Sequence, residues 1–271
     1  MTQNLTDAQT VPVTTLLELL AVQSMGDDVF VAQNRSDARG GMYGGQVVGQ
    51  GILAAAATVA DDRTAHSLHA TFLRPGDPRQ PVSFEVHRDR DGRSYSSRRV
   101  LASQGGRLMA TMTVSFHVVE EGADAQTVSL PDTPGPDDSE PIDTSLCEIE
   151  VRVPDPQPDK HHATRVWLRC HAPLGSDGNL QVAALVYASD LFSGITDVIP
   201  VGPDDMMTSL DHTVWIHRPV RFDGWVLMDM VGVSVASSRG WYTGHLYDEA
   251  GTAIAGMAQE MVLRQAARDD A

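Results

Sequence analysis

An apolar stretch runs from Gly44 to Ala60, reads GGQVVGQGILAAAATVA and carries no charged side chain. The Gly44-Gly45 pair indicates a turn, and the run from Ala54 to Ala57 favours a helix. A helix that is apolar on all sides is buried on most sides, and about 15 residues are too few to span a bilayer. The pattern therefore predicts a short helix buried inside the protein.

Segments with apolar side chains at every second position follow this stretch. That period is typical of a strand with one buried face. The clearest are Leu68, Ala70 and Phe72; Val82, Phe84 and Val86; and the even-numbered positions from Leu108 to Val118. A buried helix followed by such strands predicts an antiparallel sheet curled around a helix. A helix over Val13–Val22 and a strand over Val29–Gln33 are expected before it.

The same order of elements returns in the second half of the chain. The predicted elements are a strand at Arg165–Cys170, a helix at Leu180–Ile195, and strands at Val214–Ile216, Trp225–Val235, Trp241–Tyr247 and Ala253–Leu263. The pairs Arg74-Pro75 and Arg218-Pro219 lie 144 residues apart (219 − 75), and Gly106 and Gly251 lie 145 apart (251 − 106). An offset held this closely indicates two copies of one unit. We expect their sheets to pair edge to edge, with sites between them.

The segment Glu120–Pro158 separates the two copies and is rich in Pro and Asp, which is typical of a linker. We therefore expect a first unit over residues 13–119, a linker over 120–158 and a second unit over 159–265. Met1–Pro12 is expected to be a loose terminus.

Composition narrows the possible functions of this 271-residue chain. A net charge of −16 argues against a nucleic-acid partner, because phosphate binding needs a basic surface. An anionic small ligand held by a few local arginines is still allowed. Cys147 and Cys170 are too few for a disulfide scaffold or a Cys-rich zinc site. Met1–Thr10 lacks the basic start and apolar run of a signal peptide, and no apolar run reaches membrane-spanning length. A cytoplasmic protein is expected.

Six sequence motifs, taken together and in order, resemble those of the acyl-CoA thioesterase II family. They are GGQVVGQ (44–50), HSLHATFLRPGD (66–77), DGRSYSSRRV (91–100), YASD (187–190), SLDHTVWIHRP (209–219), and ASSRG (236–240) with AQE (258–260). The resemblance implies an α+β fold of the double hotdog type, in which two tandem antiparallel sheets each wrap around a central helix. It also implies hydrolysis of acyl-CoA thioesters to free fatty acid and CoA by an activated water. A homo-oligomer is expected, without cofactor or metal.

Asp190 is the first candidate catalytic residue. It is the only charged residue in the predicted helix Leu180–Ile195, and a buried carboxylate is usually paired, protonated or functional. It could equally be the N-cap of a shorter helix that starts at Leu191. The resemblance favours the functional interpretation, because the family's catalytic aspartate occupies this YASD position.

Gln259 and Ser209 are the second and third candidates. Gln259 interrupts an otherwise apolar row on the last strand, although that row could instead be the solvated face. Ser209 stands at a strand start, where serine is most often turn chemistry. The resemblance assigns catalytic roles to both positions, but the family usually has threonine at the position of Ser209. A carboxylate, an amide and a hydroxyl can together hold and deprotonate one water, while backbone N–H groups at a helix start polarise the thioester carbonyl.

Five arginines are candidates for the CoA phosphates, because arginine binds phosphate in a bidentate manner. They are Arg74, Arg98, Arg99, Arg218 and Arg239, and each could equally be an ordinary surface charge. His66 and His69 are left out of the catalytic set. Neither His161-His162 nor Cys170-His171 has zinc-site spacing.

Two other functions compete with thioester hydrolysis. A hotdog acyl-CoA hydratase or dehydratase typically carries an Asp-x-Asn-x-x-His signature, which this sequence lacks. A non-catalytic acyl-CoA-binding protein would leave the three polar positions free to vary, yet two match the family and one is changed conservatively. The segment Gly232–Ala236 lacks the final glycine of a serine-hydrolase elbow and no helix follows it.

Overall fold

The structure is a computed structural model that describes residues 13–34, 41–154 and 163–266. The expected loose terminus Met1–Pro12 and the last residues of the expected linker, 155–158, lie outside these ranges. None of the helices in the described part of the chain is long and apolar enough to cross a membrane.

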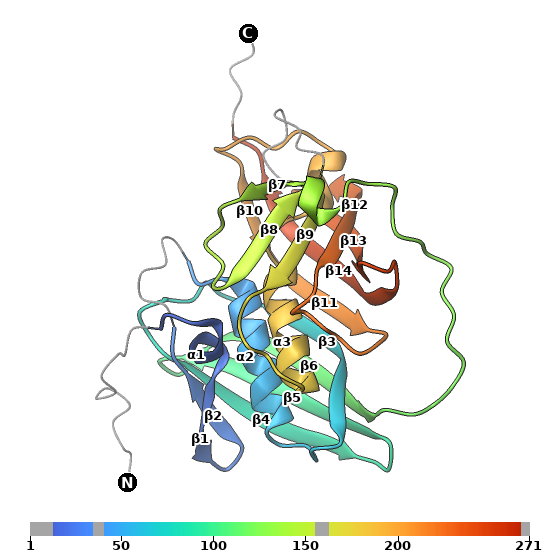
Figure 1. The fold of residues 1–271 in the computed structure, drawn as a ribbon. Helices are drawn as coiled ribbons and strands as arrows, with labels where there is room; N and C mark the ends of the chain where they lie inside the picture. The colour runs from blue at the N-terminus through green and yellow to red at the C-terminus, as the bar shows by residue number, and fades with distance from the viewer. Residues whose placement is uncertain (1–12, 35–40, 155–162, 267–271) are drawn as a thin grey trace.

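One antiparallel sheet of 14 strands forms the frame of the described residues (Figure 1). The strands of the first half are β1 (Val22–Gly26), β2 (Val29–Ala32), β3 (Arg63–Phe72), β4 (Val82–Asp91), β5 (Tyr95–Gln104) and β6 (Arg107–Val118). Those that follow are β7 (Glu140–Ile142), β8 (Ile149–Val153), β9 (Arg165–Cys170), β10 (Met206–Ser209), β11 (Asp211–Ile216), β12 (Val226–Ala236), β13 (Arg239–Asp248) and β14 (Ala253–Arg264).

The two halves join where β3 pairs with β11, with Thr213 opposite His69. From this seam the order runs β3-β6-β5-β4-β2 on one side and β11-β14-β13-β12-β9 on the other. The halves therefore repeat one strand order in opposite directions. The prediction that two units pair their sheets edge to edge is confirmed.

The helices are α1 (Leu16–Leu20), α2 (Gly44–Ala56), α3 (Gly178–Ser189) and the short 3-10 turns η2 (Pro136–Asp138) and η3 (Gly194–Asp197). The apolar helix predicted after Gly44 is α2, and the residues along most of its length are buried. It packs antiparallel against α3, because Gly45 lies against Tyr187 and Gly49 lies against Ala183. The predicted first helix is shorter than expected, since Thr15 and Glu18 form a capping box and β1 begins at Val22.

The segment expected to be a linker is not a linker over its whole length. Residues 140–142 and 149–153 form β7 and β8, and β8 pairs with β9. Ile149, Val151 and Val153 are buried on one face of β8. Their period-two alternation provides a core face, which outweighs the loop-forming Pro and Asp around them.

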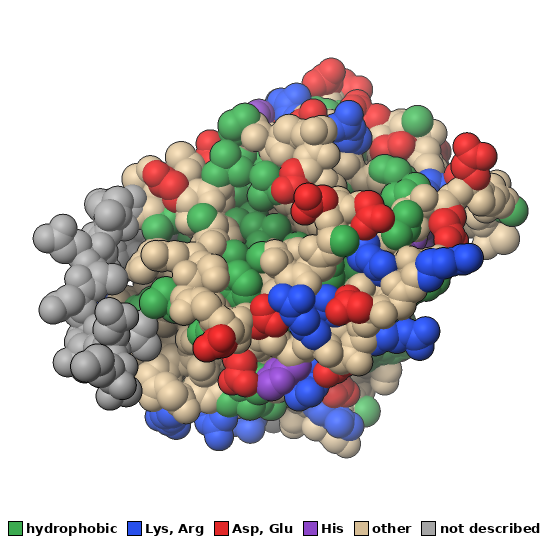
Figure 2. All heavy atoms as spheres, turned by 90° about the horizontal axis from the view of Figure 1, so that it is seen from below, with side chains coloured by type: hydrophobic (Ala, Val, Ile, Leu, Met, Phe, Trp, Pro, Cys, Tyr) green, Lys and Arg blue, Asp and Glu red, His purple; other side chains and the backbone are tan. Residues whose placement is uncertain are grey.

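Acidic and basic side chains lie interspersed around an apolar area on the face shown in Figure 2.

Candidate active site

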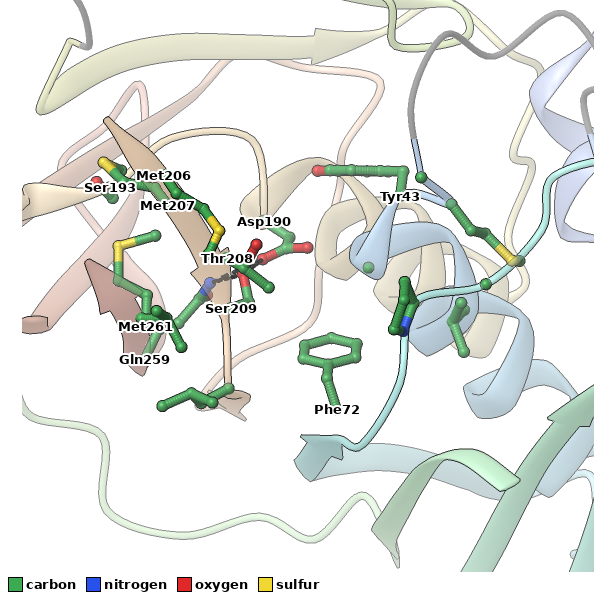
Figure 3. Close-up of a pocket in the computed structure, with 18 of the residues that line it drawn as sticks. Tyr43, Phe72, Asp190, Ser193, Met206, Met207, Thr208, Ser209, Gln259 and Met261 are labelled. Atoms are coloured by element: carbon green, nitrogen blue, oxygen red, sulfur yellow. Dashed lines mark hydrogen bonds between the residues drawn. The ribbon is translucent and has the colours of Figure 1, made fainter. Parts of the chain in front are cut away.

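The three candidate residues come from different elements and converge on one point (Figure 3). Asp190 is the C-cap of α3, Ser209 ends β10 and Gln259 lies on β14. The amide nitrogen of Gln259 donates to Asp190 Oδ1 at 3.0 Å and to Ser209 Oγ at 2.5 Å. Ser209 Oγ lies 3.4 Å from the same Asp190 oxygen. The pairing of β10 with β14 places Ser209 opposite Met261, two residues from Gln259 on the same face of β14.

Asp190 is the C-cap of α3, so the predicted helix Leu180–Ile195 ends earlier than expected, and the alternative that Asp190 is the N-cap of a helix starting at Leu191 is wrong. The helix α3 ends at Ser189, and the start of α2 packs against that end. A side chain at Gly44 would place its Cβ 2.6 Å from Asp190 Oδ2, and one at Gly45 would place it 2.4 Å from the Tyr187 carbonyl oxygen. Only glycine permits this approach, which lets the Gly45 N–H donate to the Asp190 carboxylate.

The side chain of Asp190 is only 4% exposed. Burial raises its pKa above the ordinary value of 3.8, because desolvation disfavours the charged form. His212, the Gln259 amide, the Gly45 N–H and the Ser209 hydroxyl act in the opposite direction and lower the pKa. Asp190 is thus a carboxyl group with an increased affinity for protons, and four groups stabilise its ionised form.

The face of β14 that carries Gln259 is buried, so the alternative of a solvated face is wrong. Gln259 is 2% exposed, and Ala255, Met257 and Met261 on the same face are buried as well. A buried amide needs hydrogen-bond partners on both its oxygen and its nitrogen. Its nitrogen donates to Asp190 and Ser209, and its oxygen accepts a hydrogen bond from His212 Nδ1.

His212 is a member of this network that the sequence interpretation missed. Its side chain is fully buried on β11, with Nδ1 at 2.5 Å from Gln259 Oε1 and Nε2 at 2.9 Å from Ser189 Oγ. Nδ1 also lies 3.9 Å from Asp190 Oδ1. The sequence pattern does indicate that His212 is buried, because it lies two residues before Val214 and so on the same inner face of the strand.

A cavity of about 1030 Å³ opens at the three candidate residues. Phe72, Leu191 and Phe192 contribute to its largely apolar wall. Five methionines also line it: Met42, Met109, Met206, Met207 and Met261. Thioether side chains are flexible and polarizable, so they adapt to apolar ligands of varied shape.

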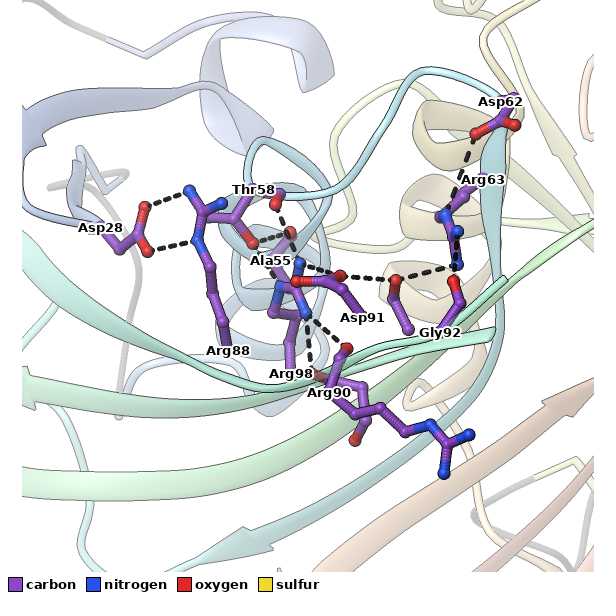
Figure 4. A network of polar contacts seen from close by, with 12 residues as sticks. Asp28, Ala55, Thr58, Asp62, Arg63, Arg88, Arg90, Asp91, Gly92 and Arg98 are labelled. Atoms are coloured by element: carbon purple, nitrogen blue, oxygen red, sulfur yellow. Dashed lines mark hydrogen bonds and ion pairs between the residues drawn. The ribbon is translucent and has the colours of Figure 1, made fainter. Parts of the chain in front are cut away.

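The five candidate arginines have different surroundings. Arg98 is 1% exposed and bonds to Thr58 and Asp91 (Figure 4), so it has no access to a substrate phosphate. Arg99 pairs with Asp89 and Arg239 with Glu260. Arg218 lines a different cavity, and Arg74 is the one of the five candidates that lines the cavity that holds Asp190. Arg264, which was not among the candidates, lines that cavity too.

Comparison with known proteins shows similarity over nearly the whole chain. Family models for the acyl-CoA thioesterase N-terminal and C-terminal domains match residues 33–117 and 123–263. The human acyl-coenzyme A thioesterase 8 is 29% identical, over 95% of this chain and 90% of that protein.

Solved structures agree with this similarity. The crystal structure of the acyl-CoA thioesterase II TesB2 from Mycobacterium marinum is 31% identical, with a TM-score of 0.80 over 93% of this chain and 98% of that one. A hot dog fold protein from Alicyclobacillus acidocaldarius, 18% identical, shares the fold with a TM-score of 0.79 over 93% of this chain and 98% of its own. The double hotdog expected from the sequence is confirmed, and the chain belongs to the acyl-CoA thioesterase II family.

Proposed function

We propose that this protein hydrolyses acyl-CoA thioesters to a free fatty acid and CoA. The observation that carries the proposal is the direct contact of Asp190, Ser209 and Gln259 at the wall of a largely apolar cavity. The chain's membership of the acyl-CoA thioesterase II family supports the same reaction.

In this mechanism Asp190 is the general base that removes a proton from the attacking water. A base works best when its pKa is close to the working pH, and burial shifts the pKa of Asp190 upward, in that direction. Ser209 and Gln259 orient the water through their hydroxyl and amide groups. His212 is a positioning residue, because its hydrogen bond to Gln259 Oε1 orients the amide nitrogen of Gln259 toward Asp190 and Ser209.

The start of α2 polarises the thioester carbonyl in the same proposal. The N-cap residue Tyr43 makes no side-chain capping bond, and both Tyr43 and Gly44 line the cavity. The first N–H groups of a helix have no partner within the helix, and the helix dipole is positive at this end. The Gly45 N–H already donates to Asp190, so the other N–H groups at this start and the helix dipole stabilise the negative charge that develops on the carbonyl oxygen as water adds.

The environment of His212 disfavours the hydratase alternative. Hydration of an enoyl-CoA needs an acid and a base that both reach the substrate. His212 lies 3.9 Å from Asp190 but is fully buried, and its two ring nitrogens contact Gln259 and Ser189.

We also propose a cytoplasmic homo-oligomer. Cys147 and Cys170 are buried thiols, which suits a reducing compartment. Val231, Val233 and Trp241 are large apolar side chains that are 40–53% exposed on β12 and β13, where they suit contact with another copy. Light scattering that gives a mass of 29.2 kDa, the mass of one chain, would contradict the oligomer.

The central experiment is an assay of free thiol released from acyl-CoA substrates of increasing chain length. Release of CoA together with fatty acid is expected. An absence of thiol release across the series, from folded protein that binds acyl-CoA, would favour the non-catalytic binding alternative.

A further inference from the structure

The internal repeat extends to the hydrogen bonds of two arginines. Arg74 follows the end of β3 by two residues and Arg218 follows the end of β11 by two. Arg74 Nη1 donates to the carbonyl of Leu108, and Arg218 Nη1 donates to that of Ala253. The acceptors are 145 residues apart (253 − 108) and the arginines 144 (218 − 74), so the two side chains occupy equivalent positions.

The backbones around the two arginines repeat in the same way. The N–H groups of Leu73 and Arg74 both donate to the Met109 carbonyl, at 2.7 and 3.2 Å. Those of His217 and Arg218 both donate to the Ile254 carbonyl, at 2.8 and 3.3 Å. Each guanidinium is therefore anchored by one nitrogen at the same place in its half of the protein.

The two arginines differ in what their other nitrogens bind. Arg218 Nε and Nη2 both contact the carboxylate of Asp124, with Nε at 3.0 Å from Oδ1. Asp124 comes from the segment between the two halves and reaches the second cavity, which Arg218 lines. At this position of the repeat, an anchored arginine thus presents two N–H groups to a planar anion.

Within the part of the chain that the structure describes, no acid takes the equivalent place beside Arg74. Its Nε and Nη2 have no hydrogen-bond or ion-pair partner among residues 13–34, 41–154 and 163–266, and its side chain is exposed at the cavity of Asp190. Asp205 lines this cavity as well, and its carboxylate accepts the backbone N–H groups of Gly202 and Ala266. Arg264 adds a second positive charge to the same wall.

We propose that Arg74 is an anion-binding residue that holds a phosphate group of the CoA moiety, in the manner in which Arg218 holds Asp124. Phosphate oxygens match the two parallel N–H groups of an arginine as a carboxylate does. Arg74 lies two residues beyond Phe72, the last residue of β3, a backbone span of at most about 7 Å. Phe72 packs at Gly44 beside Asp190, so the phosphate binds away from the reacting carbonyl while the thioester reaches the catalytic residues. This inference rests on the proposed acyl-CoA substrate.

The test compares Arg74→Ala with the parent protein on three thioesters of one fatty acid, namely those of CoA, 3′-dephospho-CoA and pantetheine. Loss of one charge-assisted interaction is expected to raise KM for acyl-CoA by about 10- to 100-fold. Turnover should stay near the parent value, because the interaction is made equally in the ground and transition states. With the pantetheine thioester, which has no phosphate, the two proteins should have the same KM.

The intermediate substrate identifies the phosphate. If the defect of Arg74→Ala disappears with the 3′-dephospho-CoA thioester, the residue holds the 3′-phosphate. If the defect persists there and disappears only with pantetheine, it holds the pyrophosphate. Arg74→Lys keeps the charge without the planar pair of donors, so an intermediate KM is expected.

Arg218→Ala is the matched control, since it removes the equivalent arginine from the other half. It should lower the melting temperature through the loss of the Asp124 pair and leave KM for acyl-CoA unchanged. An unchanged KM in Arg74→Ala, or an equal rise with pantetheine, would overturn the proposal. Titration calorimetry with CoA alone separates this outcome from a failure of the proposed hydrolysis. CoA affinity should fall in Arg74→Ala even if no thioester is cleaved, and equal affinity would refute the anion site.

Discussion

The two ends of the helix pair α2 and α3 occupy equivalent positions in the repeated unit, but their side chains differ in chemistry. At the end that forms the candidate active site, Tyr43, the N-cap of α2, makes no side-chain capping bond, and the C-cap of α3 is Asp190. At the opposite end, α3 starts with its own cap, because Asp177 accepts the N–H groups of Asn179 and Leu180 at 2.9 and 3.2 Å. The C-cap of α2 there is Ala57.

Just past the carboxyl end of α2, the buried side chain of Arg98 binds the chain. Arg98 donates to both the hydroxyl and the carbonyl of Thr58, and the same guanidinium pairs with Asp91 (Figure 4). The negative end of the helix dipole stabilises a positive charge at this position. The helix termini at this end are therefore satisfied by the protein itself.

Cavity size does not distinguish the two ends. The second cavity has about 980 Å³, against about 1030 Å³ at Asp190. The repeat offsets place Ala65 at the position of Ser209 and Val114 at that of Gln259, so the second end lacks the hydroxyl and the amide. The two ends therefore differ in three polar side chains and in whether the N-cap side chain caps its helix, and these are the features on which the proposed reaction depends.

The largest effect is expected from Asp190→Asn, which keeps the shape of the side chain and removes its ability to accept a proton. Turnover should fall by about 100- to 10,000-fold, the usual loss when a general base is removed. The change should appear in kcat more than in KM. Ser209→Ala should cost less, and Ser209→Thr, which restores the family's usual residue, should stay active. A folded Asp190→Asn protein that turns over at the parent rate would show that Asp190 is not the base.

A smaller effect is expected from His212→Leu, which removes the donor that orients the Gln259 amide. Misplacement of a positioned group by about 1 Å costs on the order of 100-fold in rate. In a Gln259→Ala background, the same change should cause a much smaller loss, because the positioning effect acts through Gln259 and only the direct charge effect of His212 on Asp190 is left. His212→Asn should recover part of the rate, since its amide can stand in for Nδ1, whereas His212→Gln should not. Equal losses in both backgrounds would mean that His212 acts independently of Gln259.

The raised pKa of Asp190 also predicts how stability depends on pH. The folded state binds this proton more tightly than the unfolded chain, so the contribution is full below the unfolded pKa of about 3.8 and is lost as pH rises through the higher folded pKa. The side chain of Asp190→Asn is neutral at every pH, so this variant does not bury a charge at neutral pH. Its melting temperature should therefore exceed that of the parent by a few degrees at neutral pH, and the difference should shrink as pH falls toward 3.8. A lower melting temperature for the variant at neutral pH would contradict this expectation.

The smallest effect on activity is expected at the opposite end. Asp177→Ala removes the cap of α3 and should lower the free energy of unfolding by about 1 kcal/mol. Denaturant titration measures that loss, and kcat should remain unchanged because this end carries none of the proposed catalytic groups. A tenfold fall in kcat would mean that the second end contributes to the reaction.

The sequence predicted the repeat and the seam well, because both depend on patterns repeated within the chain. The offset between Arg74 and Arg218 is an alignment of the chain with itself, and the structure reproduces it bond by bond. Element ends were harder to predict. The helix α3 stops at Ser189, although no glycine or proline follows until Gly194. The packing of α2 against this end is a tertiary contact that local propensity does not contain.

The candidate site was only partly accessible to sequence reasoning. Asp190, Ser209 and Gln259 were suggested as polar interruptions of apolar patterns, but their mutual contact depends on the register between β10 and β14. His212 was overlooked, although it shares an alternating face with Val214. Arg98 could not be separated from the exposed arginines, because its burial depends on the path of β5 beneath the end of α2.

The seam between β3 and β11 has an evolutionary consequence. In a symmetric dimer of separate single-hotdog chains, one sequence would encode both ends of the helix pair, and every substitution would appear twice. A single chain that carries both units is free of that constraint. Ala65 and Val114 could diverge from Ser209 and Gln259 without affecting them. The covalent joining of the halves thus allows the two ends of the helix pair to carry different side chains.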